Sequence, residues 1–496
     1  MEERRGIVLV DQSLHIKEFT PIPLQSMSVS IQEIVENGLR LEASLYSTKH
    51  GQVRRDLQKC KWDIVPLENF FILTPFYLER FKRVYVSQGD GIPLILPSQI
   101  TEICPKANKF ISSETDFDIE TAKVKRGQIL LTRSGTVGVV AFVSDTLDGK
   151  YLSDDVIRIE AQYPGYIYTY LKSKMGRLLV ETNNYGAVIS HIEPEHLKNI
   201  PVPNPPPTIK RRIHNLIEES FKLRDESNKL MDEAQHLLKN ELKLPDIEKI
   251  QYKAKQFDQT AGVMNYSVPN SELSNRFDGS YHIPIVREIE RHITKNAKEV
   301  TQIGDERISQ SVILPGRFKR VYVEEGRGVV FFGGKQIFEL DPSNKKYPCF
   351  NNYLSVIHHA DRITNQLTLN ENMTLITCSG TIGKVCIVPK HWEGWTANQH
   401  IIRVVPADRS IAGYLHAWLS SDYSYHLITR FTYGAVVDEI DDEHVLQVSI
   451  PLLKNNKVQV EINELVLSAN EKRTRAYLLE QKALKILDEK VVYARD

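Results

Sequence analysis

The sequence predicts an α+β fold in which one unit is built twice: a mostly-β globule with mixed α/β elements, followed by a long helix. Two observations lead to this prediction. Several segments recur in the same order about half a chain apart, and each copy ends in a stretch whose apolar residues have heptad spacing. We expect the two long helices to pair as an antiparallel coiled coil, which would relate the globules by a pseudo-two-fold axis.

The internal repeat is clearest in three pairs of segments. The stretch RFKRVYV at 80–86 returns unchanged at 317–323. LLTRSGTVGVV in the first half returns as LITCSGTIGKV, and YGAVISHIEPEHL returns as YGAVVDEIDDEHV. Because the period is about half of the 496 residues, the pattern excludes a solenoid of short repeats.

Each globule has the pattern of short strands joined by tight turns. GIPLILPSQI and VKRGQILLTRSGTVGVVAFVS are apolar, β-branched and interrupted by Gly, Pro and Ser. SGTVG and SGTIG are typical of turns, whose glycines would supply positive φ or close backbone approach. GYIYTYLKSKMGRLLVETN and AGYLHAWLSSDYSYHLITRF then show helical spacing of apolar residues. The turn glycines are Gly135, Gly138, Gly380 and Gly383.

A long helix with an a/d seam is predicted after each globule, the first directly after the proline cluster PVPNPPP. Many seam positions are small or polar, which favours pairing of the two helices with each other. The alternative is two unrelated amphipathic helices, each covering its own globule. The predicted seams are Ile213, Leu216, Ser220, Leu223, Ser227, Leu230, Ala234 and Leu237, and Ile462, Leu465, Ala469, Ala476, Leu479, Ala483 and Ile486.

These boundaries divide the chain into five parts: an N-terminal extension over 1–30, a first globule over 31–207, a first long helix over 208–255, a second globule over 256–453 and a second long helix over 454–496. A helix of thirty-odd residues spans roughly 50 Å. Two such helices packed antiparallel would hold the globules at opposite ends, so that one chain imitates a dimer. Dimeric DNA readers use such symmetry to address two half-sites.

Composition restricts the class of protein. Lys plus Arg and Asp plus Glu both number 63, so any nucleic-acid contact must be local. The five cysteines form no CxxC pair, which favours a reducing compartment, and no metal is expected. The N-terminal segment lacks the apolar core of a signal peptide, and no run approaches the roughly 20 apolar residues of a membrane span. We therefore expect a cytoplasmic protein that makes no membrane contact.

The ordered motifs resemble the specificity subunits of Type I restriction-modification systems. The resemblance covers nearly the whole chain from about Ile31 and rests on IPLILPSQI with its counterpart GVVFFGGKQI, on RGQILLTRSGTVG, and on YGAVISHIEPEHLKNIPVP with the helix after it. Each motif alone is weak, but the ordered set is present twice. Differences such as Val139 against Lys384, or SHIEP against DEIDD, suit two domains that read different bases.

The resemblance implies two target-recognition domains separated by helical spacers, and no catalysis by this chain. It implies binding to a bipartite, asymmetric site on double-stranded DNA. It also implies two adenine-methyltransferase subunits as partners and, in the full complex, translocating endonuclease subunits. S-adenosylmethionine, ATP and magnesium would then belong to the partner subunits, and this chain would hold no cofactor of its own.

Motifs of a self-contained enzyme are weak in this sequence. Asn204-Pro205-Pro206 is reminiscent of the NPPY signature of adenine methyltransferases, but Pro207 stands where an aromatic residue would stack on a flipped base. No P-loop of the form GxxxxGK[ST] exists. Pro245-Asp246 lacks the spaced ExK of metal-dependent nucleases. Two alternatives stay open: a DNA-modifying or DNA-cleaving enzyme with unrecognised motifs, and a helical scaffold that never meets nucleic acid.

The candidate DNA-contacting residues follow from comparing the two copies. Residues that both copies share should hold phosphate or structure, and residues that differ should specify bases. RFKRVYV, expected to be a strand, would supply phosphate contacts, although its identity in both copies could equally reflect folding. Arg133 against Cys378 and His191 against Glu439 are the candidates for discrimination. The predicted DNA-binding set is Arg80, Lys82, Arg83, Arg133, Ser134, Tyr185, His191, Arg317, Lys319, Arg320, Ser379, Lys384 and Tyr433.

Overall fold

The computed structural model describes residues 28–36, 53, 56–116, 118–182, 191–255, 266–273, 276–343, 353–434 and 436–494. The predicted mixture of strands and helices is confirmed, with a long helix near the C-terminal end. Two globules pack on a pair of long helices. We call the described residues of 56–203 head 1 and those of 276–453 head 2. The N-terminal extension over 1–30 lies almost entirely outside the described residues.

Head 1 contains two four-stranded sheets. The first has the strand order β2 (Phe71–Phe76), β9 (Val156–Ala161), β6 (Ile129–Thr132) and β7 (Val140–Phe142). The second has the order β3 (Tyr85–Val86), β5 (Lys109–Ser112), β4 (Gly91–Ile95) and β8 (Tyr151–Leu152). β1 (Ile64–Pro66) pairs with β10 (Pro201–Pro203). The helices are α1 (Ile31–Glu36), which precedes head 1, α3 (Ile119–Ala122), α4 (Pro164–Lys172), α5 (Lys174–Thr182) and α6 (Pro194–Lys198).

Head 2 repeats this strand order. Its four-stranded sheet runs β12 (Ser309–Ile313), β18 (Ile401–Pro406), β15 (Thr374–Thr377) and β16 (Val385–Ile387). A second sheet runs β14 (Tyr353–Ser355), β13 (Gly328–Phe332) and β17 (Thr396–Ala397), and β11 (Glu299–Gln302) pairs with β19 (Ser449–Leu452). The helices are α8 (Ile247–Lys255), which precedes head 2, α9 (Pro284–Asn296), α10 (Val356–Arg362), α11 (Arg409–Leu419), α12 (Asp422–Thr429) and α13 (Asp442–Leu446).

Two sequence predictions about local structure are wrong. The helix predicted over 208–255 ends as α7 (Pro207–Glu241), because Lys243 has a φ of 49° and Pro245 cannot continue a helix; α8 is separate. The strand predicted over RFKRVYV is limited to β3 in head 1, and in head 2 that segment contributes only an isolated bridge between Tyr322 and Leu354. The charged residues of both copies therefore lie on irregular backbone.

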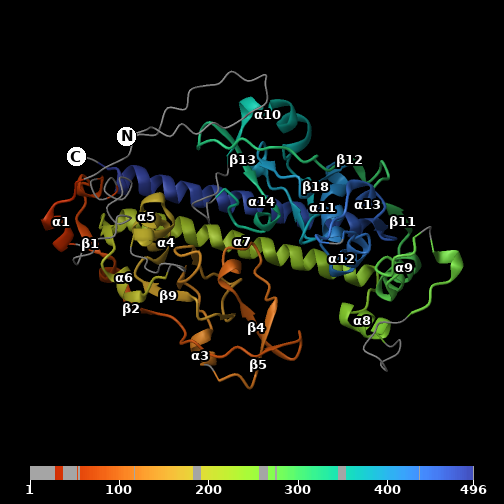
Figure 1. The fold of residues 1–496 in the computed structure, drawn as a ribbon, viewed down its shortest axis with the longest axis horizontal. Coiled ribbons are helices and arrows are strands. Elements are labelled where there is room, and N and C mark those ends of the chain that lie inside the picture. Colours follow the sequence, from red (N-terminus) through yellow and green to blue (C-terminus); the bar gives the residue numbers. More distant parts are fainter. Residues whose placement is uncertain are drawn as a thin grey trace, which may run out of the picture.

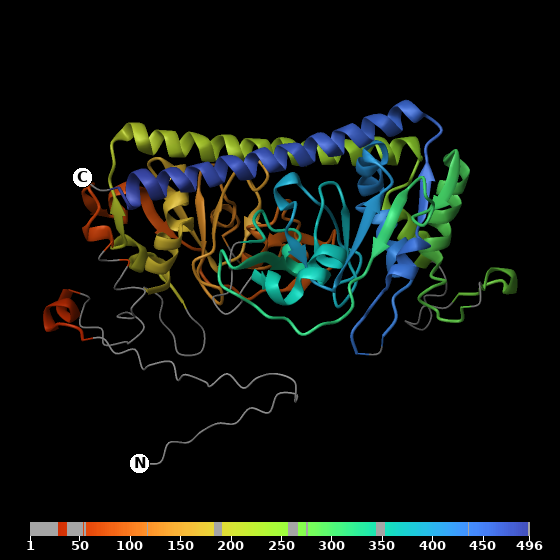
Figure 2. The same cartoon turned by 90° about the horizontal axis from the view of Figure 1, so that it is seen from above.

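The long helices α7 and α14 (Asn456–Leu487) pack against each other in opposite directions. Ser220 Oγ donates to the Ala476 carbonyl at 2.7 Å, and Lys472 Nζ lies 2.6 Å from Glu226 Oε2. The small seam residues allow this close approach. Figure 2 shows the pair as one long edge of the molecule, with both heads beneath it.

Each head packs on a different end of the helix pair. The core of head 1 includes Ile213 and Ile217 from the start of α7 and Ile486 from the end of α14. The core of head 2 includes Leu238 and Ile462, from the other ends of the same helices. Figure 1 shows the heads displaced toward opposite ends of the pair.

The buried surface of α7 is wider than an a/d seam because the helix also packs on the heads. Phe221, Asp225 and Asn228 are buried, whereas the predicted seam residues Leu216 and Leu230 are only half-buried. Asp225 accepts hydrogen bonds from the backbone and side chains of the 144–146 loop of head 1, at 2.6 to 3.0 Å. α7 therefore holds a defined loop of head 1 in addition to its partner helix.

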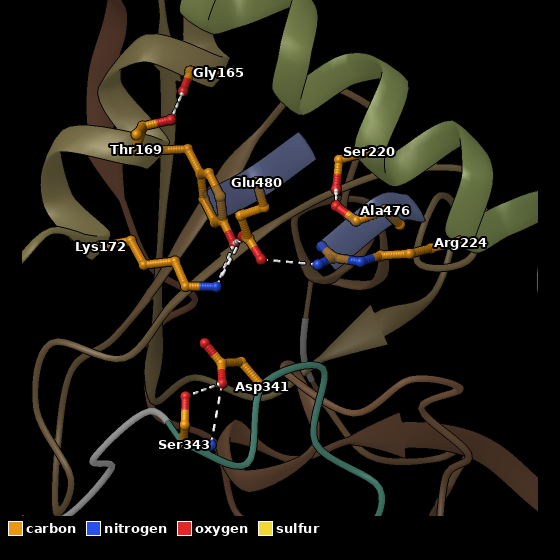
Figure 3. Close-up of polar contacts among 10 residues, drawn as sticks. Gly165, Thr169, Lys172, Ser220, Arg224, Asp341, Ser343, Ala476 and Glu480 are labelled. Atoms are coloured by element: carbon orange, nitrogen blue, oxygen red, sulfur yellow. Dashed lines mark hydrogen bonds and ion pairs between the residues drawn. The ribbon is translucent and has the colours of Figure 1, made fainter. Parts of the chain in front are cut away.

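A buried ion cluster joins both long helices to head 1. Glu480 of α14 is fully buried and accepts from Tyr168 Oη at 2.5 Å, Lys172 Nζ at 2.8 Å and Arg224 Nη2 at 2.8 Å (Figure 3). Burial alone would raise the pKa of Glu480, but Arg224 and Lys172 hold it well below its ordinary value of 4.5. Asp341 of head 2 lies opposite the two cations.

The heads also contact each other directly through equivalent residues. Ile103 N donates to the Phe338 carbonyl at 2.7 Å, and Leu340 N donates to the Thr101 carbonyl at 2.9 Å. These residues belong to the segments PSQITEI and GKQIFEL, which correspond in the sequence repeat. The contact is reciprocal, as in an isologous dimer interface, although both halves belong to one chain.

Replacing Glu480 should strongly destabilise the fold. In Glu480→Gln, two cations lose their buried counter-charge, and we expect a loss of about 3–5 kcal/mol in the free energy of unfolding. The matched control is Glu226→Gln, which breaks a more exposed ion pair and should cost about 1 kcal/mol or less. Chemical denaturation at pH 7 measures both variants.

The same substitution should alter the pH dependence of stability. Because the folded pKa of Glu480 is depressed, its contribution is present above the unfolded value near 4.5 and declines as the pH falls toward the folded pKa. The difference in the free energy of unfolding between wild type and Glu480→Gln should therefore become smaller as the pH falls. A difference that is constant from pH 7 to pH 3 would contradict the assignment.

Candidate nucleic-acid interface

The SGTVG and SGTIG segments form equivalent turns in the two heads. Gly138 has a φ of 83° and Gly383 a φ of 77°, and in each case an added Cβ would press against a helix of the same head, α5 through Val180 and α12 through Tyr425 and Thr429. The predicted turns are confirmed. Glycine is required at these two positions because the backbone is left-handed and closely covered.

A shared set of backbone hydrogen bonds places three chain segments side by side next to each turn. In head 1, Arg133 N donates to the Asp155 carbonyl at 2.9 Å and Ile192 N to the Arg133 carbonyl at 3.0 Å, while Ser134 and His191 form a bridge. Three chain segments thus bring together positions 134, 155 and 191.

Head 2 repeats these bonds with other side chains. Cys378 N donates to the His400 carbonyl at 3.1 Å and Ile440 N to the Cys378 carbonyl at 3.0 Å, while Ser379 and Glu439 form the bridge. Positions 379, 400 and 439 therefore correspond to 134, 155 and 191. The backbone is the same in both heads, and the side chains it presents differ.

In head 1, the RFKRVYV segment is tied to two carboxylates. Arg83 Nη2 forms an ion pair with Asp154 and lies 3.5 Å from Asp155 Oδ2. Ser134 Oγ donates to Asp155 Oδ1 at 2.6 Å. Burial alone would lower the pKa of Arg83, but the hydrogen bond to Asp154 raises it above its ordinary value. The Arg83 side chain is therefore a fixed, charge-compensated group.

Arg133, predicted to discriminate bases, is buried within head 1. Its guanidinium is paired with Glu193 and lies 4.1 Å from the ring centroid of Tyr77. The corresponding residue of head 2 is Cys378, and burial raises its pKa to about 12. A thiol with so high a pKa stays neutral near pH 7, so this position carries a charge only in head 1.

In head 2, the RFKRVYV segment has different neighbours. Arg317 Nη2 lies 3.0 Å from Glu439 Oε1, and the Arg317 side chain remains 79% exposed. Arg320, the counterpart of Arg83, lies 5.8 Å from the Phe331 ring centroid and forms no ion pair with any residue in the described part of the chain. The pKa of His400 is lowered, mainly by burial and in addition by the charges of Arg320 and Arg317. His400 is therefore neutral near pH 7.

The remaining predicted residues are mostly exposed. Arg80, Lys82 and Lys319 project from the irregular segments of the two heads, and Lys384 lies 5.3 Å from the Phe338 ring centroid. Tyr433 is 44% exposed and bridges to Glu439, in the connection from α12 to α13 that projects away from the long helices (Figure 2). Tyr185 lies outside the described residues.

Sequence comparison missed two pairs of equivalent residues. Asp154 and Asp155 of head 1 correspond to Gln399 and His400 of head 2, because Ser153 N and Asn398 N make equivalent bonds to β4 and β13. The signal was available, since SDDVIRI aligns with NQHIIRV across the starts of β9 and β18.

The second missed pair is a buried arginine in each head. Arg158 and Arg403 are fully buried and donate only to backbone carbonyls, among them Leu152 at 3.1 Å and Asn398 at 3.1 Å. Burial lowers the pKa of Arg158 to about 10 and that of Arg403 to about 9. These arginines bond to the backbone just before positions 155 and 400. They therefore fix the backbone that carries these two positions from the interior of each head.

Within the described ranges, no group of three or more His, Cys, Asp or Glu side chains is arranged to hold a metal ion. Among the described helices, none combines the length and apolar character that a membrane crossing requires.

Comparison with solved structures gives matches to proteins of Type I restriction-modification systems. The S subunit from M. genitalium matches at 12% identity with a TM-score of 0.33, covering 88% of this chain and 96% of that one. The HsdS subunit from Thermoanaerobacter tengcongensis matches at 15% identity with a TM-score of 0.25, covering 86% and 95%. A chain from a structure described as showing complex assembly and conformational transition of the type I R-M system matches at 15% identity with a TM-score of 0.26, covering 86% and 96%.

All three proteins come from the systems that the repeated motifs resemble. No family model and no curated protein matches the sequence.

Proposed function

We propose that this chain is a non-catalytic specificity subunit that binds a bipartite, asymmetric site on double-stranded DNA. The observation that supports this most directly is the pair of heads with the same backbone hydrogen bonds and different side chains at positions 155 and 400, and 191 and 439. A duplicated reader with unlike contact residues suits a target whose two halves differ.

The arrangement of the heads supports a split target. In the proposal, the antiparallel helix pair acts as a spacer, and the reciprocal contact between Thr101 and Leu340 limits how far apart the heads can move. A pseudo-two-fold relation between the heads would match the local two-fold symmetry of the DNA backbone. Arg80 and Lys82 of head 1 and Arg317, Lys319 and Arg320 of head 2 would neutralise phosphates on either half-site.

The chemistry of modification and cleavage would belong to partners. We propose two adenine-methyltransferase subunits and, in the full complex, translocating endonuclease subunits, which would bring S-adenosylmethionine, ATP and magnesium. The proposed compartment is the cytoplasm. An enzyme whose motifs are not recognised stays the alternative function.

DNA binding and turnover by the purified chain distinguish these functions. We expect binding to duplex DNA that weakens steeply between 50 and 200 mM salt, because phosphate contacts release counterions. We expect no label on the DNA after incubation with tritiated S-adenosylmethionine, and no cleavage with magnesium. Label incorporation or cutting by the chain alone would favour the enzyme, and binding that is absent at all salt concentrations would reject DNA recognition.

The spacing between half-sites should follow the length of the helix pair. Inserting one heptad after Lys229 in α7 and one after Ser468 in α14 should break the contact between Thr101 and Leu340 and move the heads apart by about 10 Å, or about three base pairs, with little change in helical phase. Methylome sequencing of a host that carries the complete system reads the preferred spacing directly. If the variant with both insertions prefers the same spacing as wild type, the length of the helices does not set the distance between half-sites.

A further inference from the structure

The two heads differ in how their equivalent arginines are compensated. Arg83 is held by Asp154, whose side chain is 7% exposed, and by Asp155, whose side chain is 26% exposed. Arg320 has Gln399 and His400 at the equivalent positions and no ion pair with a described residue. The seven residues of the two segments are identical, so the difference comes from the turns that precede β9 and β18 and not from RFKRVYV.

This difference has electrostatic consequences for a polyanion. A guanidinium already bonded to a carboxylate gains little from a phosphate, since it must give up one anion to contact another. Two carboxylates beside it also repel the phosphate backbone. Arg320 is not bonded to a carboxylate of the described residues and has no carboxylate at the positions equivalent to 154 and 155. Glu439 approaches this segment and is paired with Arg317, which is itself 79% exposed and can turn toward a phosphate. The exposed Glu324 and Glu325 follow the segment in the chain, but neither forms an ion pair with Arg320.

The exposed carboxylate of head 1 has a chemistry of its own. Asp155 is held at one oxygen by Ser134 and approached at the other by Arg83, so its position is defined while part of it faces solvent. An ionised carboxylate only accepts hydrogen bonds. In the major groove it can accept from the exocyclic amino group of cytosine and would be repelled by the acceptor edge of guanine.

We propose that Asp154 and Asp155 are specificity-determining residues: they withhold Arg83 from phosphates, so that head 2 supplies most of the sequence-independent affinity, and Asp155 accepts from a base amino group in the half-site of head 1. This inference rests on the proposed function. Head 1 would add little binding energy on random DNA and would bind well only where a base donor faces Asp155.

Affinity for random-sequence DNA tests the first part. With the full-length chain and a fluorescent 40-base-pair duplex of randomised sequence, Arg320→Ala should weaken binding about 3–10-fold and reduce the salt slope by about one. Arg83→Ala, the matched control in the identical segment, should change affinity less than about twofold. Asp154→Asn with Asp155→Asn should strengthen binding several-fold and steepen the slope, because Arg83 becomes available.

The outcomes separate this inference from the proposed function. Wild-type binding with equal losses in the two arginine variants would overturn the inference and leave DNA recognition intact. Absence of salt-dependent binding by wild type would overturn both. Thermal melting of each variant reports folding, and Arg83→Lys, which keeps the charge beside Asp154, should match wild type if head 1 is intact.

The base contact is tested by selection. In duplexes recovered from the randomised pool, Asp155→Asn should change the base preference at one or two positions of one half-site and leave the other half-site unchanged. A carboxamide both donates and accepts hydrogen bonds, so the variant should accept more than one base at these positions. Identical selected sequences for Asp155→Asn and wild type would show that Asp155 does not read a base.

Discussion

The fold depends on one buried carboxylate that is bonded from three directions. Glu480 of α14 receives Arg224 from α7 and Tyr168 and Lys172 from α4. Buried ions are stabilising only when their geometry is well satisfied, and a shift of either helix would leave a charge unpaired. The apolar seam alone would allow one helix to slide along the other, because small residues such as Ser220 and the alanines opposite it do not interlock. The ion cluster therefore sets the register between the helices and fixes head 1 on both.

At the other end of the helix pair, head 2 is attached through neutral side chains in place of the buried carboxylate. His416 of α11 replaces Tyr168 and is buried, and burial lowers its pKa to about 3, so it stays neutral. Asn463 of α14 accepts from Gly413 N at 2.8 Å, where His214 of α7 accepts from Gly165 N at 3.2 Å in head 1. Each head is thus attached by its own chemistry, and a change at one attachment need not disturb the other.

Features that depend on local sequence could be predicted, and those that depend on distant partners could not. The turns at Gly138 and Gly383 and the long helix α14 follow from positive φ and heptad spacing. The compensation of Arg83 could not be predicted, because Asp154 lies 71 residues away along the chain. The ion pair of Arg133 has the same origin, since its partner Glu193 lies 60 residues away along the chain.

The side chains at positions 133, 155 and 191 can differ from those at 378, 400 and 439 because backbone hydrogen bonds hold these positions together in both heads. Positions 133 and 378 are fixed through their N–H and carbonyl groups, which every residue except proline supplies in full. Arginine in one head and cysteine in the other therefore keep the same hydrogen bonds. The side chains at 155 and 400 project from turns, and Arg158 and Arg403 bond to backbone carbonyls of the residues just before these turns. Substitution at such a position alters the chemistry offered to a ligand without removing a bond on which the fold depends.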